Sequence, residues 1–208
     1  MATVTGIARG NREVPAWSSP QHFDPEIRHL DIGQLPSIQA FLSGLDQETR
    51  CLRFGPLISN AALDQYAVSA LDNAALMLGI FSEQRLRGLL ELYGRTGSSV
   101  VELLLVVERA SRRCGLGWRL IDASMRHATQ MGARCVDLIY ASDNWPMRRI
   151  AQKAGGTIDL VFGTFRARID LASRPTITNH LGLPVTDVLQ TIESNTKNDI
   201  SASVPRAL

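Results

Sequence analysis

The spacing of apolar and polar residues divides the chain into short strands and helices. Helical spacing of apolar positions marks 35–45, 61–71, 116–131 and 144–154, and Asp46 has the character of an N-cap that begins a further short helical piece. Alternating or continuously apolar runs predict strands over 26–32, 74–81, 86–93, 100–107, 134–140, 157–164 and 165–171. This order predicts an α+β fold of the layered α/β type, with a mixed sheet and helices on both faces.

The strand predicted at 100–107 is apolar at every position except Glu102. A strand of this character is typical of the centre of a sheet that is covered on both faces. Glu102 is therefore a charge in an apolar setting, and such a carboxylate is either paired with a cation or functional. Arg87 and Arg95 are the pairing candidates, whereas Glu91 in the preceding strand is expected at a solvated position.

All of these elements fall within residues 26–171, which we expect to form one domain of the 208-residue chain. Residues 1–25 show no helical or strand period and predict a flexible N-terminal arm. From residue 172 to 208 the composition shifts to Ser, Thr, Asn and Pro, which is typical of a tail without a core of its own. Within that tail, Val185–Ile192 is a candidate docking helix, and the tail is one possible driver of a homodimer.

Composition narrows the class of function. A formal charge of +2 gives no attraction over the whole chain to nucleic acid or to an anionic membrane, so neither is an expected partner. The longest apolar run, about 74–81, is far shorter than a membrane span. The three cysteines, Cys51, Cys114 and Cys135, share no C-x-x-C spacing, so neither a disulfide framework nor a metal site is expected. These features favour a cytoplasmic protein.

The segment Arg112-Arg113-Cys114-Gly115-Leu116-Gly117 lies between the apolar strand and the longest predicted helix. A Walker A loop fails here because Trp118 and Arg119 follow Gly117, and a dinucleotide fingerprint fails because Leu120 takes the place of a small residue. Glycines at a helix start allow an anion to approach the free N–H groups, and the arginines add positive charge. The segment therefore predicts a cradle for a diphosphate, unless the glycines serve only a tight strand-to-helix turn.

Two motifs carry a resemblance to a known family. The pattern Arg112-x-x-Gly115-x-Gly117 resembles motif A of the GNAT superfamily of N-acetyltransferases, and Asn144-x-x-Met147-x-x-Ile150-x-x-x-x-Gly155 is similar to a second segment of that family. The resemblance extends over about 26–171 in the order of strands and helices. It implies a mixed, mostly antiparallel central sheet of about seven strands flanked by about four helices.

The resemblance also implies acetyl-CoA as co-substrate. Its diphosphate would bind the glycine segment, its pantetheine arm would pair with the backbone of the apolar strand like an added strand, and Asn144 would line the other side of the arm. Trp118 would lie beside the adenine or pantetheine end. The implied cofactor-binding residues are Leu105, Val106, Val107, Arg112, Arg113, Cys114, Gly115, Leu116, Gly117, Trp118 and Asn144.

In this family an acetyl group passes directly to a primary amine in a ternary complex. The acceptor would be a small molecule, a protein lysine or a protein N-terminus, and the residues of 35–71 would shape its site. Glu102 matches the place where many relatives carry a glutamate, and is the predicted base. The tyrosine that several relatives use as general acid is replaced by Ala151, so the acid is unassigned, with Tyr140, Ser142 and Asp143 as substitutes. A module that binds acyl-CoA without catalysis is the alternative.

Overall fold

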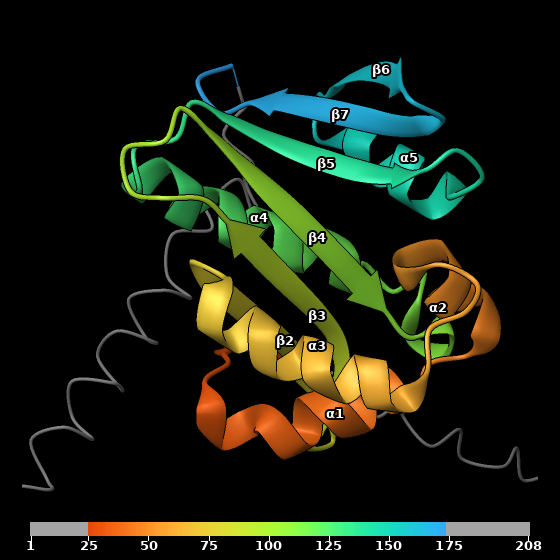
Figure 1. Ribbon diagram of the computed structural model, residues 1–208. Helices are drawn as coiled ribbons and strands as arrows, with labels where there is room; N and C mark the ends of the chain where they lie inside the picture. The colour runs from red at the N-terminus through yellow and green to blue at the C-terminus, as the bar shows by residue number, and fades with distance from the viewer. Residues whose placement is uncertain (1–24, 174–208) are drawn as a thin grey trace, which may run out of the picture.

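The computed structural model describes residues 25–173, which form one seven-stranded sheet with helices on both faces (Figure 1). The sheet order is β1-β2-β3-β4-β5-β7-β6, and only the β4–β5 pair is parallel. This confirms the predicted mixed, mostly antiparallel sheet. The strands are β1 (Glu26–His29), β2 (Leu76–Ser82), β3 (Arg85–Tyr93), β4 (Val100–Val107), β5 (Cys135–Ala141), β6 (Thr157–Val161) and β7 (Thr164–Asp170).

The described part of the chain holds five α-helices, as the apolar spacing predicts, which is one more than the family resemblance implies. They are α1 (Leu35–Ser43), α2 (Gln47–Phe54), α3 (Asn60–Asn73), α4 (Leu116–Gln130) and α5 (Trp145–Lys153). The additional helix arises because two caps separate α1, α2 and α3. The Asp46 carboxylate accepts from the Thr49 N–H at 3.0 Å, and the Ser59 hydroxyl accepts from the Ala62 N–H at 3.1 Å. None of the helices between residues 25 and 173 is long and apolar enough to cross a membrane.

The sheet separates two apolar cores. α1 and α3 cover β2 and β3 on one face, and α4 lies behind the sheet on the other (Figure 1). Side chains of β4 alternate between the two sides, so that Leu103 and Leu105 pack with α4 whereas Val106 packs with α1 and α3. Glu102 and Leu104 lie on the α1–α3 side and are half-buried. The strand is thus covered on the α4 face from Val101 to Leu105, and only in part on the α1–α3 face.

The parallel pairing of β4 with β5 is short. It runs from Val100 opposite Cys135 to Leu103 opposite Leu138 and ends there. Beyond this point β4 stays paired with β3 and β5 stays paired with β7, so the two strands diverge (Figure 1). We call the segments that no longer pair with each other, 104–107 of β4 and 139–141 of β5, the strand fork.

Two of the predictions concern segments near the ends of the chain. The N-terminal arm, except for Pro25, and the candidate docking helix Val185–Ile192 lie outside the described residues.

The turn between β3 and β4 provides a test of this framework. Gly94 has φ of 154°, and a Cβ there would lie 2.6 Å from Cγ1 and 3.2 Å from Cβ of Val101. Gly97, in the same turn, has φ of 86° and open space around its missing Cβ. Gly94→Ala therefore combines backbone strain with overpacking, and should lower the free energy of unfolding by roughly 2–4 kcal/mol. Gly97→Ala should cost only the backbone term, roughly 1 kcal/mol. Urea unfolding of both variants measures the difference, and equal losses would contradict the packing of this turn.

Candidate active site

The start of α4 has the geometry of an anion site. Arg113 and Gly115 both have left-handed backbone, with φ of 66° and 81°. Gly115 is the N-cap of α4, and no side chain caps the helix. The first N–H groups of a helix lack partners within it, and the helix dipole adds positive potential there. A Cβ at Gly115 would have nothing within 4 Å, so the space beside this N-cap residue is open.

Gly117 serves a different purpose from Gly115. A Cβ at Gly117 would lie 3.1 Å from Cδ1 of Ile150 and 3.3 Å from Cδ2 of Leu105. Its glycine therefore allows α4 to pack closely against α5 and β4. Both glycines were predicted to allow the close approach of a diphosphate. The packing of Gly117 was not predictable, because Ile150 and Leu105 are distant from it along the chain.

Arg112 turns away from the start of α4 and ties two elements together. Its Nε donates to the Val107 carbonyl at 3.1 Å, and its Nη2 donates to the Thr49 hydroxyl. That hydroxyl donates to Asp46, the cap of α2. Burial raises the pKa of the Asp46 carboxyl, but the hydrogen bonds from Thr49 and the Arg112 charge outweigh it, so the net pKa is lowered. Arg113 and Cys114, by contrast, are exposed beside the helix start.

The backbone of β4 explains which groups face the strand fork. The Glu108 N–H donates to the carbonyl of Arg87, a residue of β3, at 3.0 Å. Because successive residues of a strand direct their backbone groups to opposite sides, Val107 and Leu105 direct theirs away from β3, toward β5. Val106 directs its groups toward β3. Leu105 and Val107 are therefore placed to pair with an extended ligand, whereas Val106 is not.

The β5 side of the fork ends at α5. Asn144 caps this helix by accepting from the Met147 N–H at 3.2 Å, and Ala151, at the family's tyrosine position, is fully buried. Tyr140 lies on β5 two residues past the last β4–β5 pair, with only 5% of its surface exposed. Burial raises the pKa of its hydroxyl, which has no hydrogen-bond partner within residues 25–173. A buried hydroxyl without a partner at the fork fits a polar ligand in this place.

Trp118, on the first turns of α4, faces α5. The Lys153 Nζ lies 4.5 Å from the centroid of the Trp118 ring, and the ring packs on the core between the two helices. The structure thus places a cation on the Trp118 ring. It also gives Trp118 a packing role that is independent of any ligand.

Glu102 lies on the α1–α3 face, with Tyr93 of β3 and Asp137 of β5 opposite it on its two sides. No hydrogen bond or ion pair joins its carboxylate to another residue of the described part of the chain. Arg87, a pairing candidate from the sequence, instead bonds Glu108 at 2.8 Å and reaches Glu83 at 3.8 Å. Asp137, in turn, accepts two hydrogen bonds from Arg168, at 2.7 and 2.6 Å.

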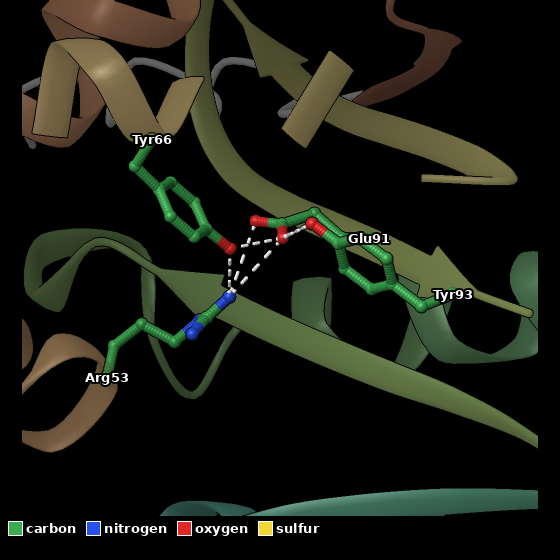
Figure 2. Close-up of polar contacts among 4 residues, drawn as sticks. All are labelled: Arg53, Tyr66, Glu91 and Tyr93. Atoms are coloured by element: carbon green, nitrogen blue, oxygen red, sulfur yellow. Dashed lines mark hydrogen bonds and ion pairs between the residues drawn. The ribbon is translucent and has the colours of Figure 1, made fainter. Parts of the chain in front are cut away.

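The expectation for Glu91 was wrong, because this side chain is buried with 1% exposed. Figure 2 shows it at the centre of a polar cluster with Arg53 of α2, Tyr66 of α3 and Tyr93 of β3. Tyr66 and Tyr93 both donate to its Oε2, the latter at 2.9 Å, and Arg53 Nη2 lies 3.3 Å from the same atom. The sequence signal was a second charge inside an apolar strand, but two of its partners, Arg53 and Tyr66, lie on helices that the spacing could not align with it.

The two tyrosines of this cluster stay protonated. Burial raises the pKa of the Tyr66 hydroxyl, and the charge of Glu91 raises it further. The same two causes raise the pKa of Tyr93. Arg53 also stacks on Phe54 and Tyr66, with its Cζ 4.8 and 5.5 Å from the ring centroids. The cluster is therefore a neutralised, hydrogen-bonded anchor for α2 and α3.

Together these features combine an anion cradle, unpaired strand backbone and a carboxylate on the opposite face. No group of His, Cys, Asp or Glu able to hold a metal occurs among residues 25–173. The arrangement can hold an extended anionic ligand along β4, and can accept a proton from a second ligand that enters from the α1–α3 face.

Comparison with solved structures places the fold. The GNAT domain of PAT from S. lividans has a TM-score of 0.60 at 16% identity, over 69% of this chain and 89% of that one. The PaiA N-acetyltransferase of Thermoplasma acidophilum, in complex with coenzyme A, has a TM-score of 0.56 at 17% identity, over 71% and 99%. YncA of Salmonella typhimurium, with acetyl-CoA, has a TM-score of 0.55 at 15% identity, over 74% and 98%.

The sequence itself supports the assignment. No curated protein matches it significantly. The sequence profile described as the acetyltransferase (GNAT) family matches residues 45–155, from the cap of α2 to the end of α5, and so spans more than half of the chain and both motifs. With the cradle at the start of α4 and the fork between β4 and β5, this match shows that the chain belongs to the GNAT acetyltransferase family.

Proposed function

We propose that this protein transfers an acetyl group from acetyl-CoA to a primary amine in a ternary complex, with Glu102 as the base. The observation that carries the proposal is the strand fork, which ends at the uncapped start of α4. Two proteins of the same fold hold coenzyme A or acetyl-CoA. In this chain the fork and the cradle together offer what such a ligand needs, a slot for an extended arm and a site for its diphosphate.

On the donor side, the residues act by binding and orienting. The N–H groups at the start of α4 and the charge of Arg113 would hold the diphosphate. The backbone groups of Leu105 and Val107 would pair with the pantetheine arm, and a β4 N–H at the fork would stabilise negative charge on the thioester oxygen. Acetyl-CoA supplies the activated acetyl group. Arg112 would act on this site indirectly, because its own hydrogen bonds fix Val107 and α2.

On the acceptor side, Glu102 would take a proton from the incoming ammonium or from its attack product. The amine nitrogen then bonds to the acetyl carbon and the carbon–sulfur bond breaks. The leaving thiolate takes a proton from water, or from Tyr140 if its hydroxyl reaches the sulfur. Glu102 suits this role because Glu91 and Asp137, which lie on the two neighbouring strands on this face, are held by Arg53 and Arg168.

The first experiment measures donor and acceptor separately. Calorimetric titration with acetyl-CoA tests the donor site, and thiol release with a panel of alkylamines, polyamines, aminoglycosides and lysine peptides tests transfer. We expect micromolar binding of acetyl-CoA and turnover with at least one amine. Absence of binding would overturn the proposal. Binding without turnover on any amine would favour the alternative of a catalytically silent acyl-CoA module.

The cradle predicts the effect of a charge at Gly115. Gly115→Asp places a carboxylate and a side chain in front of the free N–H groups, and should weaken acetyl-CoA binding by more than roughly tenfold. Gly163→Asp is the matched control, because Gly163 also has left-handed backbone, with φ of 80°, and open space, but lies in the β6–β7 turn. Calorimetry on both variants decides. Equal affinities would sink the cradle assignment.

The base predicts a selective loss of rate. Glu102→Gln should leave the acetyl-CoA dissociation constant unchanged and lower kcat by about 10²–10⁴ at neutral pH. The loss should shrink at high pH, because the free amine then forms in solution without help from the enzyme. Glu83→Gln, which removes an exposed carboxylate in the β2–β3 turn, should leave the rate unchanged. A pH–rate profile of Glu102→Gln that runs parallel to the wild type would make Glu102 structural.

A further inference from the structure

The polar cluster around Glu91 leaves one oxygen available to a ligand. Tyr66 donates its proton to Glu91 and accepts from Arg53 Nη2 at 2.5 Å, so both sides of its hydroxyl are engaged. Tyr93 donates its proton to Glu91 at 2.9 Å. Arg53 reaches Tyr66 and Glu91, and no hydrogen bond joins it to Tyr93. Toward a further group, the Tyr93 oxygen can therefore act only as an acceptor.

The strand register places Tyr93 beside Glu102. Tyr93 and Glu102 are directly opposite each other on β3 and β4, on the α1–α3 face, where the Cβ atoms of such pairs are about 4.5–5.5 Å apart. The Tyr93 side chain reaches back along β3 to Glu91, as Figure 2 shows. Glu91 lies opposite Leu104, which is the first residue of β4 beyond the last β4–β5 pair. The Tyr93 hydroxyl thus lies at the level where the strand fork begins.

Burial separates the roles of the three side chains. Glu91 is buried and receives hydrogen bonds from Arg53, Tyr66 and Tyr93, so it has little capacity left to bind a ligand. Tyr93 and Glu102 are only half-buried and lie at the edge of this cluster. Glu91 therefore fixes the direction of the Tyr93 proton, which leaves the lone pairs of the Tyr93 oxygen to accept from another group.

We propose that Tyr93 binds the acceptor nitrogen. Its oxygen accepts a hydrogen bond from one N–H group of this nitrogen, and Glu102 accepts a hydrogen bond from another. This inference rests on the proposed function and adds a specificity-determining residue to it, because two hydrogen-bond acceptors suit an ammonium group better than a hydroxyl. An alcohol carries a single O–H, which would go to Glu102 and leave the Tyr93 oxygen without a donor. A site built to receive hydrogen bonds discriminates strongly against a ligand that lacks them. Glu91 and Arg53 are positioning residues in this scheme.

The test uses two variants that each remove one hydrogen bond to Glu91. Tyr93→Phe should raise the KM of the fastest amine in the panel by about 10- to 100-fold, the value of a hydrogen bond to a charged group, with the acetyl-CoA dissociation constant unchanged. Tyr66→Phe should leave that KM within about threefold, although it lowers the stability of the fold. Equal effects of the two variants on KM would overturn the proposal, because only loss of support for Glu91 would then be at work.

A binding measurement keeps the test independent of turnover. With saturating CoA, calorimetric titration of the same amine should give a dissociation constant that rises for Tyr93→Phe and not for Tyr66→Phe. Thermal unfolding of both variants sets a temperature at which each is folded. If no amine is acetylated by the wild type, the proposed function fails. If amines are acetylated and Tyr93→Phe binds them as the wild type does, only the role of Tyr93 fails.

Discussion

The divergence of β4 and β5 is the constraint on which the rest of this structure depends. Parallel strands normally stay paired, because a backbone N–H or carbonyl without a partner is costly away from water. Here β4 leaves its partner after Leu103, while its other edge stays bonded to β3 as far as Val107. β5 in turn keeps β7 as its partner up to Ala141. Each strand is therefore hydrogen-bonded along one edge, and the backbone N–H and carbonyl groups on the facing edges have no partner strand.

Side chains on both sides hold the fork in place. Gly117 lets α4 approach Leu105 and Ile150, which fixes the start of the helix against the diverging strand. Arg112 donates hydrogen bonds to the Val107 carbonyl and the Thr49 hydroxyl, and so links the end of β4 to the start of α2. Because α2 also carries Arg53, this helix connects the hydrogen bonds of the glycine motif with those of Glu91.

Local patterns predicted most of the fold and the donor side. The bounds of β4 followed from a run that is apolar except at Glu102, and the start of α5 followed from Asn144, whose cap bond spans three residues. The start of α4 was likewise readable from Gly115. Interactions over long sequence distances were not predictable. Glu91 lies 38 residues from Arg53 and 25 from Tyr66, and nothing in the spacing of these residues aligns them. The direction of Arg112 was hidden for the same reason, since Thr49 is 63 residues away.

The donor site depends on local patterns, whereas the acceptor site depends on residues that are distant along the chain. A donor that is common to a family is held by backbone groups and a helix start, which short motifs encode. An acceptor that differs between members is bound by side chains drawn from several elements, and their charges must be counted in the folded chain. On the α1–α3 face, Arg53 neutralises Glu91 and Arg168 neutralises Asp137, whereas within residues 25–173 no cation pairs with Glu102 between them. A positively charged group that enters beside Glu102 would complete this balance, which is the physical reason to expect an amine there.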